Sequence, residues 1–134
     1  MPSVRLVRRY VFSSAHRLHS AELSPEENAR LYGKCNNPQG HGHNYAIEVA
    51  VTGPVDARTG FCCDLTAVDS AVRRAVLDRF DHQDLNALPE FARLVPTGEN
   101  IARVVWDKLI AEGLPLTSVR LQETRDNFFE YRGD

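Results

Sequence analysis

Several features that would place a protein in a specialised class are scarce in this sequence of 134 residues. No apolar run approaches the roughly 20 residues of a membrane-spanning helix, and the first residues, MPSVRLVRRYVF, lack the apolar stretch of a signal peptide. The 3 cysteines, an odd number, do not fit a disulfide framework. A formal net charge of −2 provides no basic field for nucleic acid. We therefore expect a cytoplasmic protein with reduced thiols that neither crosses a membrane nor binds DNA or RNA.

The overall composition is that of an ordinary globular protein. Hydrophobic residues make up 43% of the chain and charged residues 25%, which excludes the disordered and fibrous classes. The sequence contains no internal repeat, linker or low-complexity segment. A chain of this length suits a single hydrophobic core. We therefore expect one domain that spans residues 1–134.

Apolar alternation and β-branched residues predict two long strands in the first half of the chain. The first covers Val4–Leu18, and its imperfect alternation at Arg8–Arg9 predicts a bulge there. The second covers His43–Thr52, where every other residue is apolar. The segment FCCDL, after a turn, is expected to return as a short strand. Two further strands, SVRLQET and NFFEYR, are expected near the C-terminus.

The sequence also predicts helices with identifiable ends. Ser24 and Glu27 form a capping box that opens a short helix, and Gly33 ends it. Two longer helices have apolar residues at helical spacing, one over residues 65–80 and one that opens at Thr97.

The order of these elements, ββααββ, predicts an α+β domain: an antiparallel sheet with two helices on one face. The outer edges of such a four-stranded sheet would be open to solvent. Because open edges tend to pair with other chains, we expect neighbouring subunits to cover them.

Three histidines are candidates for a shared metal site. His41 and His43 are two residues apart at the start of a predicted strand, so their side chains point to the same side. His16 comes alongside them if the first two strands pair. Three neutral imidazoles without a fourth protein ligand would form a zinc site with one open position. The alternative is an incidental pair whose rings are satisfied by hydrogen bonds, and the H-G-H pattern alone favours neither.

Cys35 lies six residues before His41 and has three interpretations. It is a buried small hydrophobic residue, a fourth ligand that closes a zinc site, or a thiolate that a nearby divalent cation and Lys34 stabilise for chemistry. The motif alone does not choose among them. We interpret Cys62 and Cys63 as packing residues.

Two acidic residues, Asp81 and Glu123, are further candidates for a functional role. Asp81 precedes His82, and a carboxylate that orients an imidazole is common in proton relays, although such pairs also occur by chance on surfaces. Glu123 interrupts an otherwise apolar hairpin. It is either solvated at an edge or placed to bind a ligand with N–H donors. His19 has no neighbouring acidic or metal-binding residue in the sequence, and we expect it to be a surface residue.

Five separated motifs, in order, together resemble those of one family. They are FSSAHRL, CNNPQGHGHNY, FDHQDLN, PTGENIA and LQET. In this combination and spacing, the chain resembles the 6-pyruvoyltetrahydropterin synthases over nearly its whole length. The resemblance implies the tunnelling fold (T-fold), in which ββααββ subunits join their sheets into a barrel, usually as trimers stacked into a homohexamer.

The resemblance also implies a zinc enzyme. His16, His41 and His43 match the family's zinc ligands, and Cys35 matches the base that abstracts a proton. The implied reaction converts 7,8-dihydroneopterin triphosphate to 6-pyruvoyltetrahydropterin with release of triphosphate, a step of tetrahydrobiopterin biosynthesis. It needs no redox cofactor, because it combines an internal redox rearrangement with an elimination.

The remaining motifs match residues that act with the cysteine or bind the pterin. Asp81 and His82 match a pair that works with the cysteine from a neighbouring subunit. Glu123 matches the residue that anchors the guanidine-like edge of the pterin, with Thr97 nearby. One departure is Gly98, where the family's T-T-E-N stretch has a second threonine.

Two alternative functions remain. The 6-carboxytetrahydropterin synthases use the same substrate, fold and zinc, but their cysteine typically precedes H-G-H by a shorter loop, C-x-x-x-H-G-H. Here five residues separate Cys35 from His41, which favours the pyruvoyl-forming type. A non-catalytic pterin-binding protein is the alternative from another class, and the presence of Cys35, His82 and Glu123 disfavours it. Candidates for binding the triphosphate are Lys34 and some of four arginines, Arg5, Arg8, Arg9 and Arg17.

Overall fold

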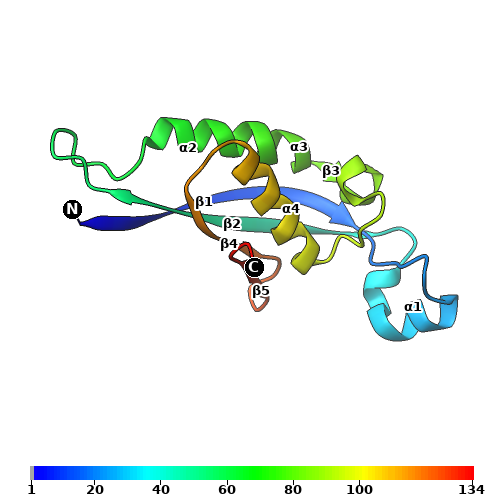
Figure 1. The fold of residues 1–134 in the computed structure, drawn as a ribbon. Coiled ribbons are helices and arrows are strands. Elements are labelled where there is room, and N and C mark those ends of the chain that lie inside the picture. The colour runs from blue at the N-terminus through cyan, green and yellow to red at the C-terminus, as the bar shows by residue number, and fades with distance from the viewer. Residues whose placement is uncertain (1) are drawn as a thin grey trace.

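The computed structural model describes residues 2–134 and contains a five-stranded sheet with helices on one face (Figure 1). The order of the strands is β3-β1-β2-β4-β5. The strands are β1 (Ser3–His16), β2 (His41–Pro54), β3 (Gln83–Asp84), β4 (Leu116–Gln122) and β5 (Phe128–Tyr131). The α-helices are α1 (Pro25–Tyr32), α2 (Leu65–Val72), α3 (Asp78–Phe80) and α4 (Gly98–Ala111).

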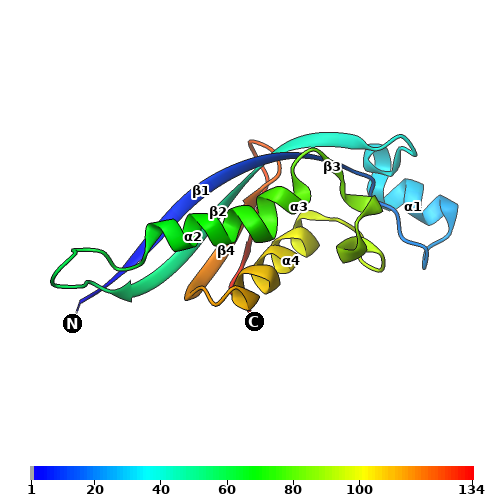
Figure 2. The same cartoon turned by 90° about the horizontal axis from the view of Figure 1, so that it is seen from above.

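The layers match the predicted α+β fold. Helices α2, α3 and α4 lie on the same face of the sheet, whereas α1 lies apart, beyond the end of the β1–β2 ribbon (Figures 1 and 2). Both ends of α1 are as predicted, with the Ser24–Glu27 capping box at its start and Gly33, at φ 56°, at its end. None of the described helices is long and apolar enough to cross a membrane.

Strands β1 and β2 pair along their whole length without a break in register. The antiparallel pairs run from Ser3 opposite Pro54 to His16 opposite His41. The predicted bulge at Arg8–Arg9 is therefore wrong. Arg8 points into the helix layer, where its guanidinium binds Asp69 at 2.8 Å, so a charged residue occupies an inward position without disturbing the alternation.

The inward face of β2 forms the centre of the core. Tyr45, Ile47, Val49 and Val51 are fully buried, as the alternation predicted. Burying each such side chain contributes about 1.5–3 kcal/mol relative to exposure. The helical residues in the same buried cluster are Val68 and Val72 of α2, Val76, Phe80 of α3, and Ile101, Ala102, Val105 and Leu109 of α4.

The segment FCCDL does not form the predicted strand. Its Asp64 is the N-cap of α2 and accepts a hydrogen bond from the Ala67 N–H at 3.2 Å, so the chain enters the helix directly after the cysteines. The Cys62 carbonyl packs so closely over the backbone of Gly53 that a Cβ there would lie 2.1 Å from it. Both cysteines have free thiols, and Cys63 packs against the core, as expected.

The helix predicted over residues 65–80 is continuous but not uniform. A π-helical stretch, Arg73–Leu77, separates α2 from α3. The sheet also has one strand that the sequence did not predict, because β3 is only two residues long and pairs in parallel with Ser14 and Ala15 of β1. Within residues 2–134, the rest of that edge of β1 has no strand partner.

Glu90 ties the segment after β3 to two helices. Its carboxylate binds Arg79 at 2.6 Å and Lys108 at 2.9 Å. The hydrogen bond from Arg79 is the main reason why the pKa of Glu90 falls to about 2. The segment that follows, which includes Phe91 and Pro96, reaches the end of β1 and lies beside His16.

We predict that Glu90→Gln destabilises the protein in a pH-dependent way. A carboxyl group whose pKa is depressed on folding stabilises the protein above its unfolded pKa, and this contribution is lost as the pH falls through the folded pKa. The expected loss at pH 7 is about 1 kcal/mol, kept small because Arg79 is 43% exposed. Urea unfolding should show the difference at pH 7 and its decline as the pH falls from about 4.5 towards 2. Equal stability of the two proteins at pH 7 would contradict the prediction.

Candidate functional site

The end of the β1–β2 ribbon brings three histidines together. The register sets His16 directly opposite His41, and His43 lies two residues further on the same face of β2. One ring nitrogen from each lies within 4.8 Å of the others, and the Nε2 atoms of His16 and His41 are 3.0 Å apart. In a tetrahedral zinc site, two ligand nitrogens at about 2.05 Å from the metal are roughly 3.3 Å apart. The three histidines could therefore hold one metal ion.

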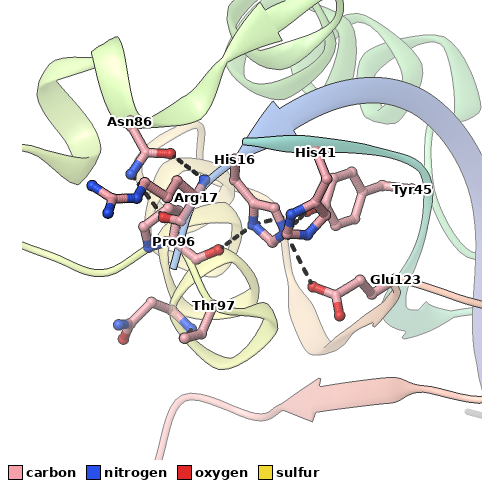
Figure 3. A network of polar contacts seen from close by, with 9 residues as sticks. His16, Arg17, His41, Tyr45, Asn86, Pro96, Thr97 and Glu123 are labelled. Atoms are coloured by element: carbon pink, nitrogen blue, oxygen red, sulfur yellow. Dashed lines mark hydrogen bonds and ion pairs between the residues drawn. The ribbon is translucent and has the colours of Figure 1, made fainter. Parts of the chain in front are cut away.

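His16 is oriented by its surroundings for such a role. The ring is 1% exposed, and its Nδ1 donates a hydrogen bond to the Pro96 carbonyl at 2.7 Å. This bond leaves Nε2 without a proton in the neutral ring, which is the form that binds a metal. Burial lowers the pKa of His16 to about 4, so the ring is neutral at pH 7. Figure 3 shows Pro96 and Glu123 on opposite sides of the His16 ring.

Glu123 lies beside the histidine cluster rather than in solvent at an edge. Its carboxylate Oε2 is 3.9 Å from His16 Nε2, and its side chain is 15% exposed. Burial, together with the charge of Glu99, raises the pKa of the Glu123 carboxyl. The backbone N–H of Glu123 donates to the Asn127 carbonyl at 3.1 Å, which fixes the β4–β5 turn. Its predicted role in binding a ligand is compatible with this position and stays a prediction.

Tyr45 belongs to the site although the sequence analysis assigned it only to the core. Its hydroxyl is 3.3 Å from His16 Nδ1 and 3.5 Å from His16 Nε2. Burial, with smaller contributions from Glu123 and Cys35, raises the pKa of Tyr45, so the hydroxyl keeps its proton. In the sequence, the one indication that Tyr45 lies at the site was its position two residues after His43, on the same face of the strand. A buried tyrosine is equally typical of an ordinary core.

Cys35 lies outside the histidine cluster. Over residues 2–134, the group able to hold a metal consists of three histidines and includes no sulfur ligand. Cys35 sits in a 3₁₀ turn, Gly33–Asn36, which is bound to the chain just after β1. The Leu18 N–H donates to the Cys35 carbonyl at 2.9 Å, and the Asn36 amide donates to the Leu18 carbonyl at 2.7 Å. The geometry therefore does not favour a closed site with cysteine as a fourth ligand.

Asp81 and His82 form an oriented pair at the outer edge of β1. The Asp81 carboxylate lies 3.0 Å from His82 Nδ1 and accepts a hydrogen bond from the Ser13 N–H at 2.9 Å. That bond from Ser13 is the main reason why the pKa of Asp81 is lowered. His82 has a φ of 60°, which non-glycine residues seldom adopt, and its N–H donates to the Ser13 carbonyl at 2.6 Å. Backbone strain of this kind is often found at functional sites.

Asp81 and His82 do not bond to Cys35 within residues 2–134. The His82 side chain is 83% exposed, and no hydrogen bond or ion pair between His82 and Cys35 occurs in the described part of the chain. The predicted cooperation of the two residues therefore stays a prediction, as does the contribution of Asp81 and His82 to a neighbouring subunit.

Thr97 is the N-cap of α4. Its hydroxyl accepts a hydrogen bond from the Asn100 N–H at 3.2 Å and still has its own proton to donate. Because Thr97 follows Pro96, the start of α4 is directly connected to the carbonyl that binds His16. The contact of Thr97 with a ligand stays a prediction.

His19, expected at the surface, is half-buried and has a hydrogen-bond partner. It lies 3.0 Å from the Asn36 amide, which donates to its Nδ1. With His16 and Arg17, it lines a cavity of about 1040 Å³, large enough for a small-molecule ligand. Of the five cations considered for a triphosphate, Arg17 lines this cavity, whereas Arg8 is paired with Asp69.

Comparisons with known proteins identify the family of the chain. A protein from Poecilia reticulata described as 6-pyruvoyl tetrahydrobiopterin synthase is 44% identical over 96% of this chain and 90% of its own length. The solved structure of Caenorhabditis elegans 6-pyruvoyl tetrahydropterin synthase has a TM-score of 0.95 and 40% identity, covering 100% of this chain and 98% of that one. A 6-carboxy-5,6,7,8-tetrahydropterin synthase from Haemophilus influenzae is 27% identical over 96% of this chain and 98% of its own length. The sequence model of the 6-pyruvoyl tetrahydropterin synthase family matches residues 5–134, and the chain belongs to this family.

Proposed function

We propose that this protein is a zinc-dependent lyase that converts 7,8-dihydroneopterin triphosphate to 6-pyruvoyltetrahydropterin and triphosphate. The observation that carries the proposal is the cluster of His16, His41 and His43 beside Glu123, in a chain that belongs to this family. The identity to the pyruvoyl-forming relative, 44%, exceeds the 27% identity to the carboxy-forming one, which supports the pyruvoyl product.

Zinc suits the three ligands on chemical grounds. Neutral imidazoles are typical zinc ligands, and catalytic zinc sites keep three protein ligands and one open position. Bound to His16, His41 and His43, zinc would supply a Lewis acid that polarises the hydroxyl groups of the substrate side chain. The bond from His16 Nδ1 to the Pro96 carbonyl supports this assignment, because such a second partner is common for metal-bound histidines.

Cys35 is proposed to abstract a proton from the substrate side chain. Its position outside the histidine cluster leaves its sulfur free for proton transfer. His82, oriented by Asp81 at 3.0 Å, is proposed to accept or return a proton in the site of a neighbouring subunit. Proton removal and return rearrange the side chain, and triphosphate leaves by elimination without an external oxidant or reductant.

Glu123 and Thr97 are proposed to bind the pterin ring. The guanidine-like edge of a pterin presents N–H donors, and a carboxylate can accept two of them in parallel. A partly buried carboxyl with a raised pKa gains most from such donors, because they stabilise its ionised form. The Thr97 hydroxyl acts as the acceptor in its hydrogen bond with the Asn100 N–H, and its own proton can be donated to a ligand.

A homohexamer of two stacked trimers is proposed as the functional assembly. Most of the outer edge of β1 has no strand partner in the described residues, so its backbone groups are able to pair with another sheet. Asp81 and His82 lie at this same edge, so association there would carry them towards a neighbouring subunit.

The proposal predicts a specific product. Purified protein loaded with zinc and incubated with 7,8-dihydroneopterin triphosphate should yield 6-pyruvoyltetrahydropterin and inorganic triphosphate, identified by mass spectrometry. The carboxy compound together with acetaldehyde would instead assign the protein to the 6-carboxytetrahydropterin synthases. A pterin that binds without reacting would leave only a binding function.

Cys35→Ala is expected to abolish turnover and leave zinc in place. Loss of a proton-transferring group typically costs 10²–10⁴-fold in rate, and we expect a decrease of at least about 100-fold. Zinc content, measured by elemental analysis, should equal that of the unmodified protein, and Cys62→Ala should retain both zinc and activity. Loss of zinc in Cys35→Ala would show that the cysteine is a ligand.

His16→Ala is expected to lose zinc and activity together. Removal of one of three ligands leaves a site too weak to retain the metal. His19→Ala is the matched control for zinc content alone, because His19 bonds to Asn36 and does not belong to the histidine cluster. Circular dichroism should establish that both variants fold. Stoichiometric zinc and full turnover in His16→Ala would refute the metal assignment.

A further inference from the structure

The first residue of α4, Gly98, is covered by an aromatic ring from β5. A Cβ added at Gly98 would lie 2.2, 2.3 and 2.7 Å from three carbon atoms of the Phe129 ring. In real proteins a Cβ essentially never lies closer than 3.0 Å to a heavy atom of another residue in this way. The backbone of Gly98 does not have a positive φ. In this chain the Phe129 ring, rather than the backbone conformation, therefore occupies the space that a side chain at position 98 would need.

This contact joins the two segments that hold His16. On one side, Gly98 follows Pro96 and Thr97, and the Pro96 carbonyl accepts the hydrogen bond from His16 Nδ1 at 2.7 Å. On the other side, Phe129 pairs with Leu121 in the β4–β5 hairpin, whose turn includes Glu123. The Glu123 carboxylate lies 3.9 Å from His16 Nε2, on the opposite side of the ring from Pro96 (Figure 3).

We propose that Phe129 is a positioning residue for His16. Its ring fixes the separation between the first turn of α4 and the β4–β5 hairpin, and thereby holds the Pro96 carbonyl and the Glu123 carboxylate on the two sides of the His16 ring. A close-packed interior transmits a shift of one such group to its neighbours. The inference rests on the proposed role of His16 as a metal ligand.

A double-mutant experiment tests this role through zinc affinity. Gly98→Ala places a methyl group in the space of the Phe129 ring, so the ring and the first turn of α4 must move apart or the ring must rotate away. Losing the second partner of a metal-bound histidine typically costs 10–100-fold in affinity, and we expect zinc to bind about tenfold more weakly, measured at pH 7 by competition with a chromophoric chelator. Adding Phe129→Val removes the overlap, so the double variant should recover most of the lost affinity.

Single substitutions on β5 provide the controls. Phe128→Val removes a neighbouring ring of the same size, which is 46% exposed and lies over the Arg120 guanidinium at 4.2 Å, so zinc affinity should not change. Phe129→Val alone leaves a gap beside Gly98 and should weaken zinc binding. This variant carries the test if Gly98→Ala does not fold.

The outcomes separate positioning from mere structural support. A structural role alone would lower the unfolding temperature of Gly98→Ala and leave the zinc affinity of the folded protein unchanged. That result, or a double variant that binds zinc no better than Gly98→Ala, would overturn the proposal. Failure of the proposed reaction would appear differently, as zinc-loaded wild-type protein that does not convert the pterin triphosphate, and the zinc titrations would still decide the role of Phe129.

Discussion

The pairing of β1 with β2 is the constraint on which both the core and the site depend. Side chains alternate along a strand, so the register that buries Tyr45 and Ile47 also turns His41 and His43 inwards. The same ladder ends with His16 opposite His41. A slip of one residue would expose the apolar face of β2 and turn its two histidines to solvent. Burial of the core therefore stabilises the geometry of the histidine cluster, and no separate device is needed to bring the rings together.

His16 and Tyr45 remain compatible with this apolar setting because both are neutral. Burying an isolated charge is costly. His16 avoids this cost as a neutral ring, with a pKa lowered to about 4 and its N–H satisfied by Pro96. Tyr45 keeps its proton, and burial raises the pKa of Glu123. A bound divalent cation would be the largest charge in these surroundings, and it would favour the ionised form of Glu123.

Local patterns in the sequence predicted much of this structure, whereas contacts between distant residues account for the errors. Alternation predicted the buried face of β2, and capping residues predicted where α1 begins and ends. The bulge at Arg8–Arg9 was wrong because Arg8 is paired with Asp69, 61 residues away. The strand β3 has only two residues, too few for any periodicity, and forms by pairing with β1. At the site, the H-G-H spacing identified two candidate ligands. The cover of Gly98 by Phe129 depends on how α4 meets the hairpin, which no local pattern contains.

The arrangement of Asp81 and His82 connects the open edge of the sheet with the proposed proton transfer. A non-glycine residue stays at a φ of 60° only where its surroundings hold it in this strained conformation. Here Ser13 binds both members of the pair, through its carbonyl and its N–H. These bonds hold the backbone of His82, and Asp81 orients its ring, although the side chain is 83% exposed and has no hydrogen bond or ion pair to Cys35 within residues 2–134. A held orientation of the His82 ring suits the proposed entry of this ring into a neighbouring site. Association along β1 would then do two things at once, because it would pair the open edge of the sheet and bring an oriented imidazole towards the next subunit.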